Sequence, residues 1–224
     1  MKNLKLKTAA LSLLLTGMIS TSYAEDLSVW KLPAVPIPKD NPQTKAKIAL
    51  GHQLVFDTRL GKDNALSCTG CHDPNAGGAG PTPRAFGQGG ELGRWAPSWD
   101  NAGYYTSLFW DGRAASLEQQ TGALPGHMGP LSATAEMGGT VDEAVTRLNA
   151  IPGYKKQFNA VFGTDATPEN VAKAIAAFER TLVATHSPFQ RYVNGNKKAL
   201  SAAAKRGFEI FTKPYAPPAT PRRC

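Results

Sequence analysis

The sequence predicts a mostly α-helical fold. Apolar residues recur at helical spacing in segments 43–59 and 168–185, whereas strand signals are weak throughout. A stretch rich in Gly and Pro, 67–101, predicts a long loop between helices. With 224 residues, of which 42% are hydrophobic, the chain is large enough for one large domain or two small ones with buried cores.

The first helix is expected after a segment that cannot be helical. Residues 31–42 are rich in proline, which lacks the backbone N–H that a helix needs. The following segment, 43–59, is predicted to be helical because its apolar residues form a stripe. That stripe consists of Ile48, Leu50, Leu54, Val55 and Phe56.

Five further helices are expected downstream. Three short ones are predicted over 114–121, 141–149 and 154–162. The clearest helix covers 168–185, where Thr167 is placed to cap the N-terminus and Pro168 suits the first turn. One face of that helix carries Val171, Ile175, Phe178 and Leu182. Ser201 is placed to cap a last helix over 202–211.

The N-terminus has the pattern of a secretory leader. Lys2, Lys5 and Lys7 precede an apolar stretch over 9–20, and Ser22-Tyr23-Ala24 is a small-residue cleavage site. About 20 apolar residues are needed to span a bilayer, and this stretch is shorter. We therefore expect a signal peptide over 1–24, cleavage after Ala24, export to the periplasm and no membrane attachment afterwards.

The charge balance argues against a nucleic-acid partner. The whole chain has a net charge of +8, and loss of the three leader lysines leaves 22 of its 25 basic residues against 17 acidic ones, a net charge of +5. These charges are scattered, and no Lys/Arg cluster is interleaved with aromatic residues. We interpret the excess as a contribution to solubility or to docking with an acidic protein.

The strongest chemical motif is Cys68-Thr69-Gly70-Cys71-His72. Two cysteines three apart can form thioethers with the two vinyl groups of one haem, while the adjoining histidine binds the iron. A zinc site would need a second Cys/His pair, a redox Cys-x-x-Cys would suit a βαβ setting, and a structural disulfide is also compatible with export. The adjoining histidine, the helix-and-loop pattern and the exported address favour covalent haem c.

The sixth ligand of such a haem is not evident from the sequence. His52 is expected on the polar side of the first helix, and His186 in a loop. His127 and Met128, in a Gly/Pro-rich loop, could reach an iron but are interpreted as bystanders, and Gln88 is a poor iron ligand. If none of them binds, the distal side is open to a small oxidant.

Landmarks on both sides of this motif give the chain a family resemblance. Those up to the middle of the chain are Leu50-Gly51-His52-Gln53-Leu54-Val55-Phe56-Asp57-Thr58-Arg59-Leu60, Ala96-Pro97-Ser98, Asn101-Ala102 and Phe109-Trp110-Asp111-Gly112-Arg113-Ala114. Later ones are Leu117-Glu118-Gln119-Gln120, Glu136-Met137-Gly138, Tyr154, Phe158, Ala174-Ile175-Ala176-Ala177-Phe178-Glu179-Arg180-Thr181-Leu182 and Ser187-Pro188-Phe189. From about 43 to 211, the chain resembles the bacterial di-haem cytochrome c peroxidases, which include MauG proteins.

The resemblance implies two cytochrome c-like domains with one haem c each. We expect the N-terminal, peroxide-reacting domain over 25–163 and the beginning of the second over 164–224, with 212–224 as an aberrant tail. It also implies that hydrogen peroxide is the substrate, that a small cytochrome c or cupredoxin donates electrons, and that a homodimer is allowed. Helices after residue 165 are expected to pack around the second haem and to lack a partner without it.

The resemblance also gives residues their roles. Cys68 and Cys71 would attach the peroxide-reacting haem, with His72 as its proximal ligand. Trp110 matches the tryptophan between the two haems, Glu136 the distal acid/base and Gln120 the distal glutamine. Taken alone, Trp110 would be interpreted as a core aromatic and Glu136 as a solvated carboxylate.

Two positions depart from the family pattern. Many members have a histidine where Gln88 stands, as a removable sixth ligand, so we expect a haem that needs no reductive activation. Many also have an asparagine where Trp95 stands, beside the calcium site between the domains, so the resemblance gives calcium no firm support here.

The end of the chain departs most. In the family, the helix ending at Phe211 leads to a second Cys-x-x-Cys-His, whereas here a Pro/Arg-rich segment ends in the lone Cys224. With suitable codons, reading 215–224 from the third base of the Tyr215 codon gives Cys-Ala-Ala-Cys-His. We therefore hypothesise a frameshift, with a genuine end as the alternative, and we expect poor yield or aggregation of the chain as written.

Three functions agree with these motifs. The first is a periplasmic peroxidase, of which this chain would be an incomplete and, without the second haem, inactive copy. The second is a MauG-like protein that oxidises a partner protein. The third is a mono-haem electron carrier, which would normally use a Met or His as sixth ligand, or an inactive fragment.

Overall fold

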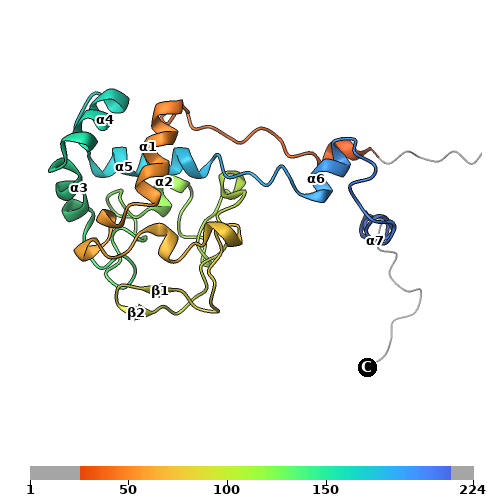
Figure 1. Ribbon diagram of the computed structural model, residues 1–224, viewed down its shortest axis with the longest axis horizontal. Helices are drawn as coiled ribbons and strands as arrows, with labels where there is room; N and C mark the ends of the chain where they lie inside the picture. The colour runs from red at the N-terminus through yellow and green to blue at the C-terminus, as the bar shows by residue number, and fades with distance from the viewer. Residues whose placement is uncertain (1–25, 213–224) are drawn as a thin grey trace, which may run out of the picture.

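The computed structural model describes residues 26–212. The expected leader and the hypothesised frameshift at 215–224 lie outside these residues. A main helical body is joined by two extended segments to a small unit of η1 (Leu27–Trp30), α6 (Pro188–Val193) and α7 (Ala202–Thr212) (Figure 1). The fold is mostly helical, as the sequence predicts.

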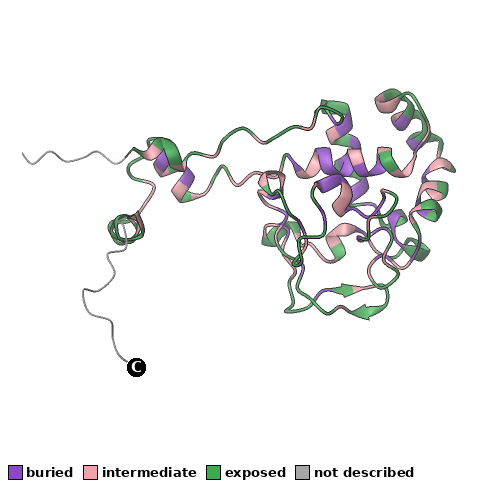
Figure 2. Cartoon of the chain, turned by 180° about the vertical axis from the view of Figure 1, so that it is seen from behind, coloured by how far each residue is buried: buried purple, intermediate pink, exposed green. Residues whose placement is uncertain are grey.

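The centre of the main body is the contact between α1 (Lys45–Val55) and α5 (Pro168–Glu179). Half of α5 is buried, namely Val171, Ala172, Ala174, Ile175, Ala176 and Ala177. On α1, Leu50, Leu54 and Val55 are 2% exposed or less. The helices α3 (Val141–Asn149) and α4 (Pro152–Phe162) add Leu148, Tyr154 and Phe158 to the same core, which is the densest buried region in Figure 2.

Helix boundaries follow the sequence where a side chain caps the helix. Thr140 and Glu143 form a capping box at α3, whose bounds agree with the prediction. Thr167 accepts a hydrogen bond from the Asn170 N–H at the start of α5, and Ser201 accepts one from the Ala204 N–H at α7. The helix α6 was not predicted, although Ser187 caps it and Pro188 opens it.

The helix α5 ends at Glu179, six residues before the predicted end. Asn101 explains the difference, because it forms hydrogen bonds with the backbone groups that would have continued the helix. Its N–H donates to the Leu182 carbonyl at 2.7 Å, and its Oδ1 accepts from the Ala184 N–H at 3.0 Å. Asn101 does so from a left-handed conformation with φ of 64°, which asparagine tolerates better than most residues.

The predicted loop over 67–101 contains little regular structure. Its only strands among residues 26–212 are β1 (Phe86–Gly87) and β2 (Gly90–Glu91), an antiparallel pair. The loop also contains two short 3-10 helices, η4 (Cys68–Gly70) and η5 (Pro74–Ala76), and three more lie beside it, namely η2 (Thr58–Leu60), η3 (Lys62–Asn64) and η6 (Ala102–Tyr104). Within the described residues, no helix is both long and apolar enough to cross a membrane.

The expectation that helices after residue 165 lack a packing partner is wrong for α5. Its apolar face lies against α1 in the main body, because Val171, Ala174 and Ile175 belong to the same buried cluster as Leu50 and Leu54. The expectation holds in part for α7, where Ile210 and Phe211 are 72% and 74% exposed. The domain boundary at 163/164 stays a prediction.

The backbones of α1 and α5 lie close together at Gly51. A Cβ at this position would lie 1.9 Å from the Ala174 carbonyl oxygen. Gly51→Ala is therefore expected to lower the free energy of unfolding by about 1–3 kcal/mol, because the helices must separate. Gly153→Ala on α4 is the control, since no atom lies within 4 Å of a Cβ there. Urea unfolding measures both, and equal effects would contradict this account.

Candidate haem site

The main body contains a cavity that is lined in part by both ends of the loop over 67–101. It holds about 590 Å³ of space between atoms, part of it open to solvent. Five of the six predicted site residues line it, namely Cys68, Cys71, His72, Gln120 and Glu136. Much of the remaining wall is apolar, formed by Leu66, Trp99, Pro130, Leu131, Met137 and Ile175. The structure therefore brings together residues that lie up to 68 positions apart.

The Cys-x-x-Cys-His motif is wound into a tight turn. The backbone N–H groups of Cys71 and His72 both donate to the Cys68 carbonyl, at 3.2 and 3.0 Å. Both thiols are free, and burial raises the pKa of Cys68 to about 12. Burial also raises the pKa of Cys71, whose Sγ donates to the Phe86 carbonyl at 3.2 Å. The motif thus presents two neutral thiols to the cavity.

His72 is held in one tautomer. Its Nδ1 lies 2.7 Å from the Gly78 carbonyl oxygen, which can only accept, so Nδ1 carries the proton. Burial lowers the pKa of His72, against the opposing effect of the Gly78 and Pro97 carbonyls, and favours the neutral ring. The lone pair is therefore on Nε2, which is the arrangement that a metal-binding histidine requires.

Glu136 reaches the cavity from a loop, and Gln120 reaches it from the end of a short helix. Burial raises the pKa of Glu136, and the charge of Arg113 opposes that rise. The backbone around Glu136 is fixed by Gln88, whose N–H donates to the Glu136 carbonyl at 2.7 Å. Gln120 is the last residue of α2 (Leu117–Gln120). The cavity thus contains a carboxyl group that can hold a proton and an amide beside the haem-binding motif.

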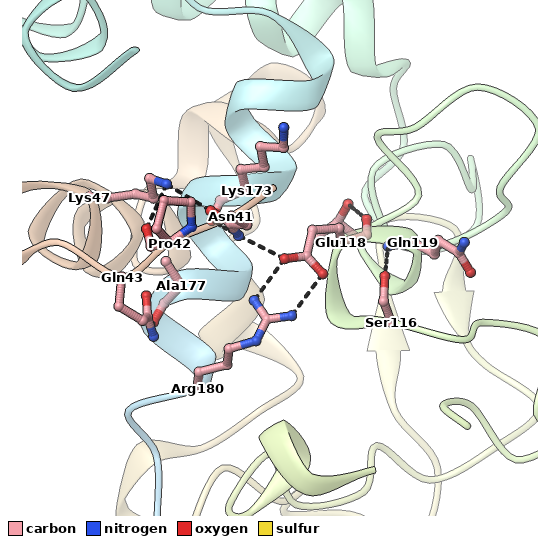
Figure 3. Close-up of polar contacts among 11 residues, drawn as sticks. Asn41, Pro42, Gln43, Lys47, Ser116, Glu118, Gln119, Lys173, Ala177 and Arg180 are labelled. Atoms are coloured by element: carbon pink, nitrogen blue, oxygen red, sulfur yellow. Dashed lines mark hydrogen bonds and ion pairs between the residues drawn. The ribbon is translucent and has the colours of Figure 1, made fainter. Parts of the chain in front are cut away.

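A buried ion pair holds α2 in place (Figure 3). Glu118 accepts two hydrogen bonds from Arg180 at 2.7 and 2.8 Å, and a third from Asn41 Nδ2 at 2.7 Å. Asn41 in turn accepts from Lys47 Nζ at 2.8 Å. Burial by itself would raise the pKa of Glu118, but the bonds from Arg180 and Asn41 outweigh it and lower the pKa. The network joins α2, and with it Gln120, to α1 and α5.

Trp110 does not line this cavity. Its side chain is 62% exposed, and its Nε1 donates to the Trp95 carbonyl at 3.0 Å. The preceding residue, Phe109, adopts a left-handed conformation with φ of 66°, which is unusual for a bulky side chain. The role of Trp110 between two haems stays a prediction.

The sequence-based candidates for a sixth ligand lie outside the cavity wall. His52 is exposed and packs against the rings of Phe56 and Phe178, and Met128 is 69% exposed. The cavity wall likewise does not include His127, His186 or Gln88. The thioether that does line the cavity is Met137, for which no sequence pattern indicated a ligand role.

Two further cavity residues, Trp99 and Glu179, were missed as site residues. Trp99 stacks on the His72 ring. Glu179 follows Ile175 by one helical turn, so it lies on the apolar face of α5. A carboxyl group at that spacing within an apolar stripe is the signal that could have identified it. Its Oε2 atom is buried without a hydrogen-bond partner among the described residues.

The unpaired Glu179 carboxyl predicts a specific pH dependence of stability. Burial raises the pKa of Glu179 from 4.5 to about 8, so the folded chain binds this proton more tightly than the unfolded chain. Its contribution to stability is complete below pH 4.5 and is lost as the pH rises through 8. Between pH 5 and 8.5, the free energy of unfolding should fall by about 2–4 kcal/mol more in the wild type than in Glu179→Gln.

Urea unfolding of the two proteins across this pH range measures the difference. Glu169→Gln is the matched control, because Glu169 lies on the exposed face of the same helix and its side chain is 62% exposed. Parallel pH profiles for the wild type and Glu179→Gln would contradict the account.

The cavity residues fit haem c. Two unlinked thiols can form the two thioether bonds of haem c, and the Nε2 lone pair can bind its iron. The apolar wall suits a porphyrin. The Oε2 atom of Glu179, which also lines the cavity, is buried without a hydrogen-bond partner among the described residues. A group with an apolar ring and polar edges matches these walls.

Sequence comparison assigns the chain to one family. The profile described as di-haem cytochrome c peroxidase matches residues 45–198. A methylamine utilization protein MauG from Methylorubrum extorquens AM1 is 42% identical over 182 residues, covering 80% of this chain and 50% of that protein. The cytochrome-c peroxidase IdrP1 of Pseudomonas sp. SCT is 38% identical, covering 93% of this chain and 54% of its own length. The chain thus spans about half the length of these relatives.

Solved structures agree on the fold. The crystal structure of a MauG-like protein associated with microbial copper homeostasis superposes with a TM-score of 0.71 at 28% identity, covering 81% of this chain and 53% of that one. The di-haem peroxidase BthA from Burkholderia thailandensis superposes with a TM-score of 0.64 at 24% identity, over 82% of this chain and 50% of that one. On its sequence and its helical fold, the chain belongs to the di-haem cytochrome c peroxidase family.

Proposed function

We propose that this chain carries the peroxide-reacting haem of an exported cytochrome c peroxidase. Cys68 and Cys71 would hold the haem through thioether bonds, and Nε2 of His72 would bind its iron. The bound haem supplies an iron centre that exchanges electrons with peroxide. The overall reaction joins hydrogen peroxide, two protons and two electrons to give two water molecules, with a small cytochrome c or cupredoxin as the electron donor.

Glu136 moves the proton in this proposal. Its carboxylate would take a proton from one oxygen of peroxide and return it to the other, which leaves as water when the O–O bond accepts the two electrons of the overall reaction. The pKa of Glu136, raised by burial, suits a group that must both accept and release this proton. The Gln120 amide lies on the same cavity and can donate a hydrogen bond that orients the peroxide.

One observation carries the proposal: Glu136 and His72, 64 positions apart, line a single cavity. A redox Cys-x-x-Cys or a structural disulfide would not need a carboxyl group and an amide on the same cavity as a neutral histidine. A zinc site would need further ligands, and no group of three or more His, Cys, Asp or Glu residues within 26–212 is placed to hold a metal ion.

A single-turnover experiment tests the proposed function. The full chain is produced in a host that attaches haem c, and its oxidised form is mixed with hydrogen peroxide in a stopped-flow spectrometer. We expect a fast change in haem absorption that consumes one peroxide per haem. This readout does not require the second haem, on which steady turnover with a donor depends. A spectrum unchanged by peroxide would refute the proposal.

A MauG-like reaction is the second candidate. The relative from Methylorubrum extorquens named MauG is 42% identical to this chain, the highest identity of the two relatives described above. The two functions differ in where the oxidising equivalents finish. If the oxidising equivalents oxidise an added, reduced small cytochrome c or cupredoxin, the chain is of the peroxidase type. Oxidised side chains on a partner protein would favour the MauG type.

An electron-carrier function makes a different prediction for Met137. A carrier would use this cavity-lining thioether as the sixth iron ligand, so Met137→Leu would open the iron and speed up its reaction with peroxide. In a peroxidase the iron is already open, and the same substitution leaves the spectrum of the oxidised protein unchanged. Comparing the absorption spectra of the two proteins separates these functions.

We propose that the chain is exported to the periplasm, with cleavage after Ala24, so the N-terminal residue of the mature protein should be Glu25 in a mass measurement. The first domain would then span 25–163, with 164–224 as the beginning of a second one. Trp110 would pass electrons between two haems in a protein that holds both.

A further inference from the structure

Trp99 lies in a parallel stack with the proposed iron ligand. The centroids of the Trp99 and His72 rings are 5.5 Å apart, and their planes differ by 9°. This separation is within the range of stacked aromatic pairs. Trp99 is only 8% exposed and also lines the cavity. Of the aromatic pairs found within residues 26–212, this is the one that includes His72.

The backbone at Gly78 is shaped around this stack. The Gly78 carbonyl oxygen accepts the His72 Nδ1–H, and a Cβ on Gly78 would lie 1.8 Å from Nε1 of Trp99. Gly78 also has a φ of 67°, a conformation that L-residues with side chains rarely adopt. The same residue therefore orients the imidazole and leaves room for the indole beside it.

The other tryptophans lack this contact. Trp110 and Trp95 are 62% and 37% exposed, and neither lines the cavity. Trp30 lies in the small unit, against the rings of Phe189 and Phe208. Indole is among the most easily oxidised side chains, and electron transfer between groups in van der Waals contact is far faster than across a gap. The indole placed to exchange an electron with the haem site is therefore that of Trp99.

We propose that Trp99 is an internal electron donor to the haem site, acting through its stack with His72. The inference rests on the proposed peroxidase function. Peroxide needs two electrons and two protons to become two waters. Trp99 would supply one of these electrons and be left as an indole radical cation, while the bound haem would supply the other; the two protons come from water. Two electrons from the reduced small redox protein, one for the indole and one for the haem, then restore the starting state.

This role differs from that expected for Trp110. The resemblance places Trp110 between two haems, so its function depends on a second haem. Trp99 would act within the first haem site and would not need a second haem. A chain with one haem should therefore still oxidise Trp99 when it meets peroxide.

Radical trapping tests the proposal. The full chain with haem attached is treated with one equivalent of hydrogen peroxide, without electron donor, in the presence of a nitroso spin trap. The adduct is then located by peptide mass spectrometry. We expect the adduct on Trp99 in the unmodified chain, and its loss in Trp99→Phe, which keeps an aromatic ring in the stack. Trp30→Phe is the matched control and should keep the adduct on Trp99.

The outcomes separate this inference from the proposed function. If peroxide changes the haem spectrum but the adduct lies elsewhere in the unmodified chain, the Trp99 inference is wrong and the peroxidase function stands. If peroxide leaves the haem spectrum unchanged, both are wrong. Since the position of the adduct is measured in the unmodified chain, the test remains decisive even if Trp99→Phe fails to fold.

Discussion

Replacing Glu136 by glutamine is expected to slow the reaction of the haem-loaded chain with hydrogen peroxide by about 10²–10⁴-fold, the usual contribution of a general acid–base group. Glutamine keeps the size and polarity of the side chain but cannot carry the proton between the two peroxide oxygens. Glu136→Asp keeps a carboxyl group and should recover part of the rate. Stopped-flow absorption of the haem measures all three proteins.

The control for this prediction is a carboxyl group away from the cavity. Glu169→Gln removes an exposed carboxyl on α5, paired with Lys173 at 2.6 Å, and should react with peroxide as the wild type does. If Glu136→Gln also reacts at the wild-type rate, Glu136 is not the proton carrier and the distal role implied by the resemblance fails.

The second large effect concerns the buried pair of Glu118 and Arg180. Glu118→Ala is expected to lower the free energy of unfolding by about 3–5 kcal/mol, because the Arg180 guanidinium would be left buried and uncompensated. The side chains of both partners are 10% exposed or less. The same change removes the acceptor for Asn41 Nδ2, so the attachment of α2 to α1 weakens as well. Urea unfolding at neutral pH measures the loss.

An exposed ion pair is the matched comparison. Glu91 lies 3.2 Å from Arg84, and both side chains are at least half exposed. Glu91→Ala should cost about 0–1 kcal/mol, because water screens this pair and solvates the arginine that remains. Equal losses for Glu118→Ala and Glu91→Ala would show that burial of the Glu118 pair has no energetic consequence.

Local signals in the sequence predicted the helices well where a cap marks their ends. The capping box of Thr140 and Glu143 lies at the predicted start of α3, and Thr167 with Pro168 opens α5 as expected. The end of α5 could not be predicted in the same way. It is set by hydrogen bonds with Asn101, which is nearly 80 residues away in sequence, and local periodicity contains no information about such a contact.

The site residues, like the helix boundaries, could be predicted from the sequence only where a local motif marks them. The haem-binding residues follow from one short motif, whereas Glu136 and Gln120 needed the family resemblance, because a lone Glu or Gln in a loop has no chemical signature. Trp99 and Glu179 were missed for another reason. The stack of Trp99 on His72 depends on the left-handed turn at Gly78. The lack of a hydrogen-bond partner for Glu179 Oε2 depends on which face of α5 lines the cavity.

The most direct test of this account is the covalent state of Cys68 and Cys71. The full chain, exported from a host with c-type haem maturation, is digested and its peptides are weighed, while a pyridine haemochrome spectrum counts the haem. The account predicts one haem per chain, bound through two thioethers to the peptide that contains Cys68 and His72. A folded, exported chain without haem, with Cys68 and Cys71 joined in a disulfide, would contradict it.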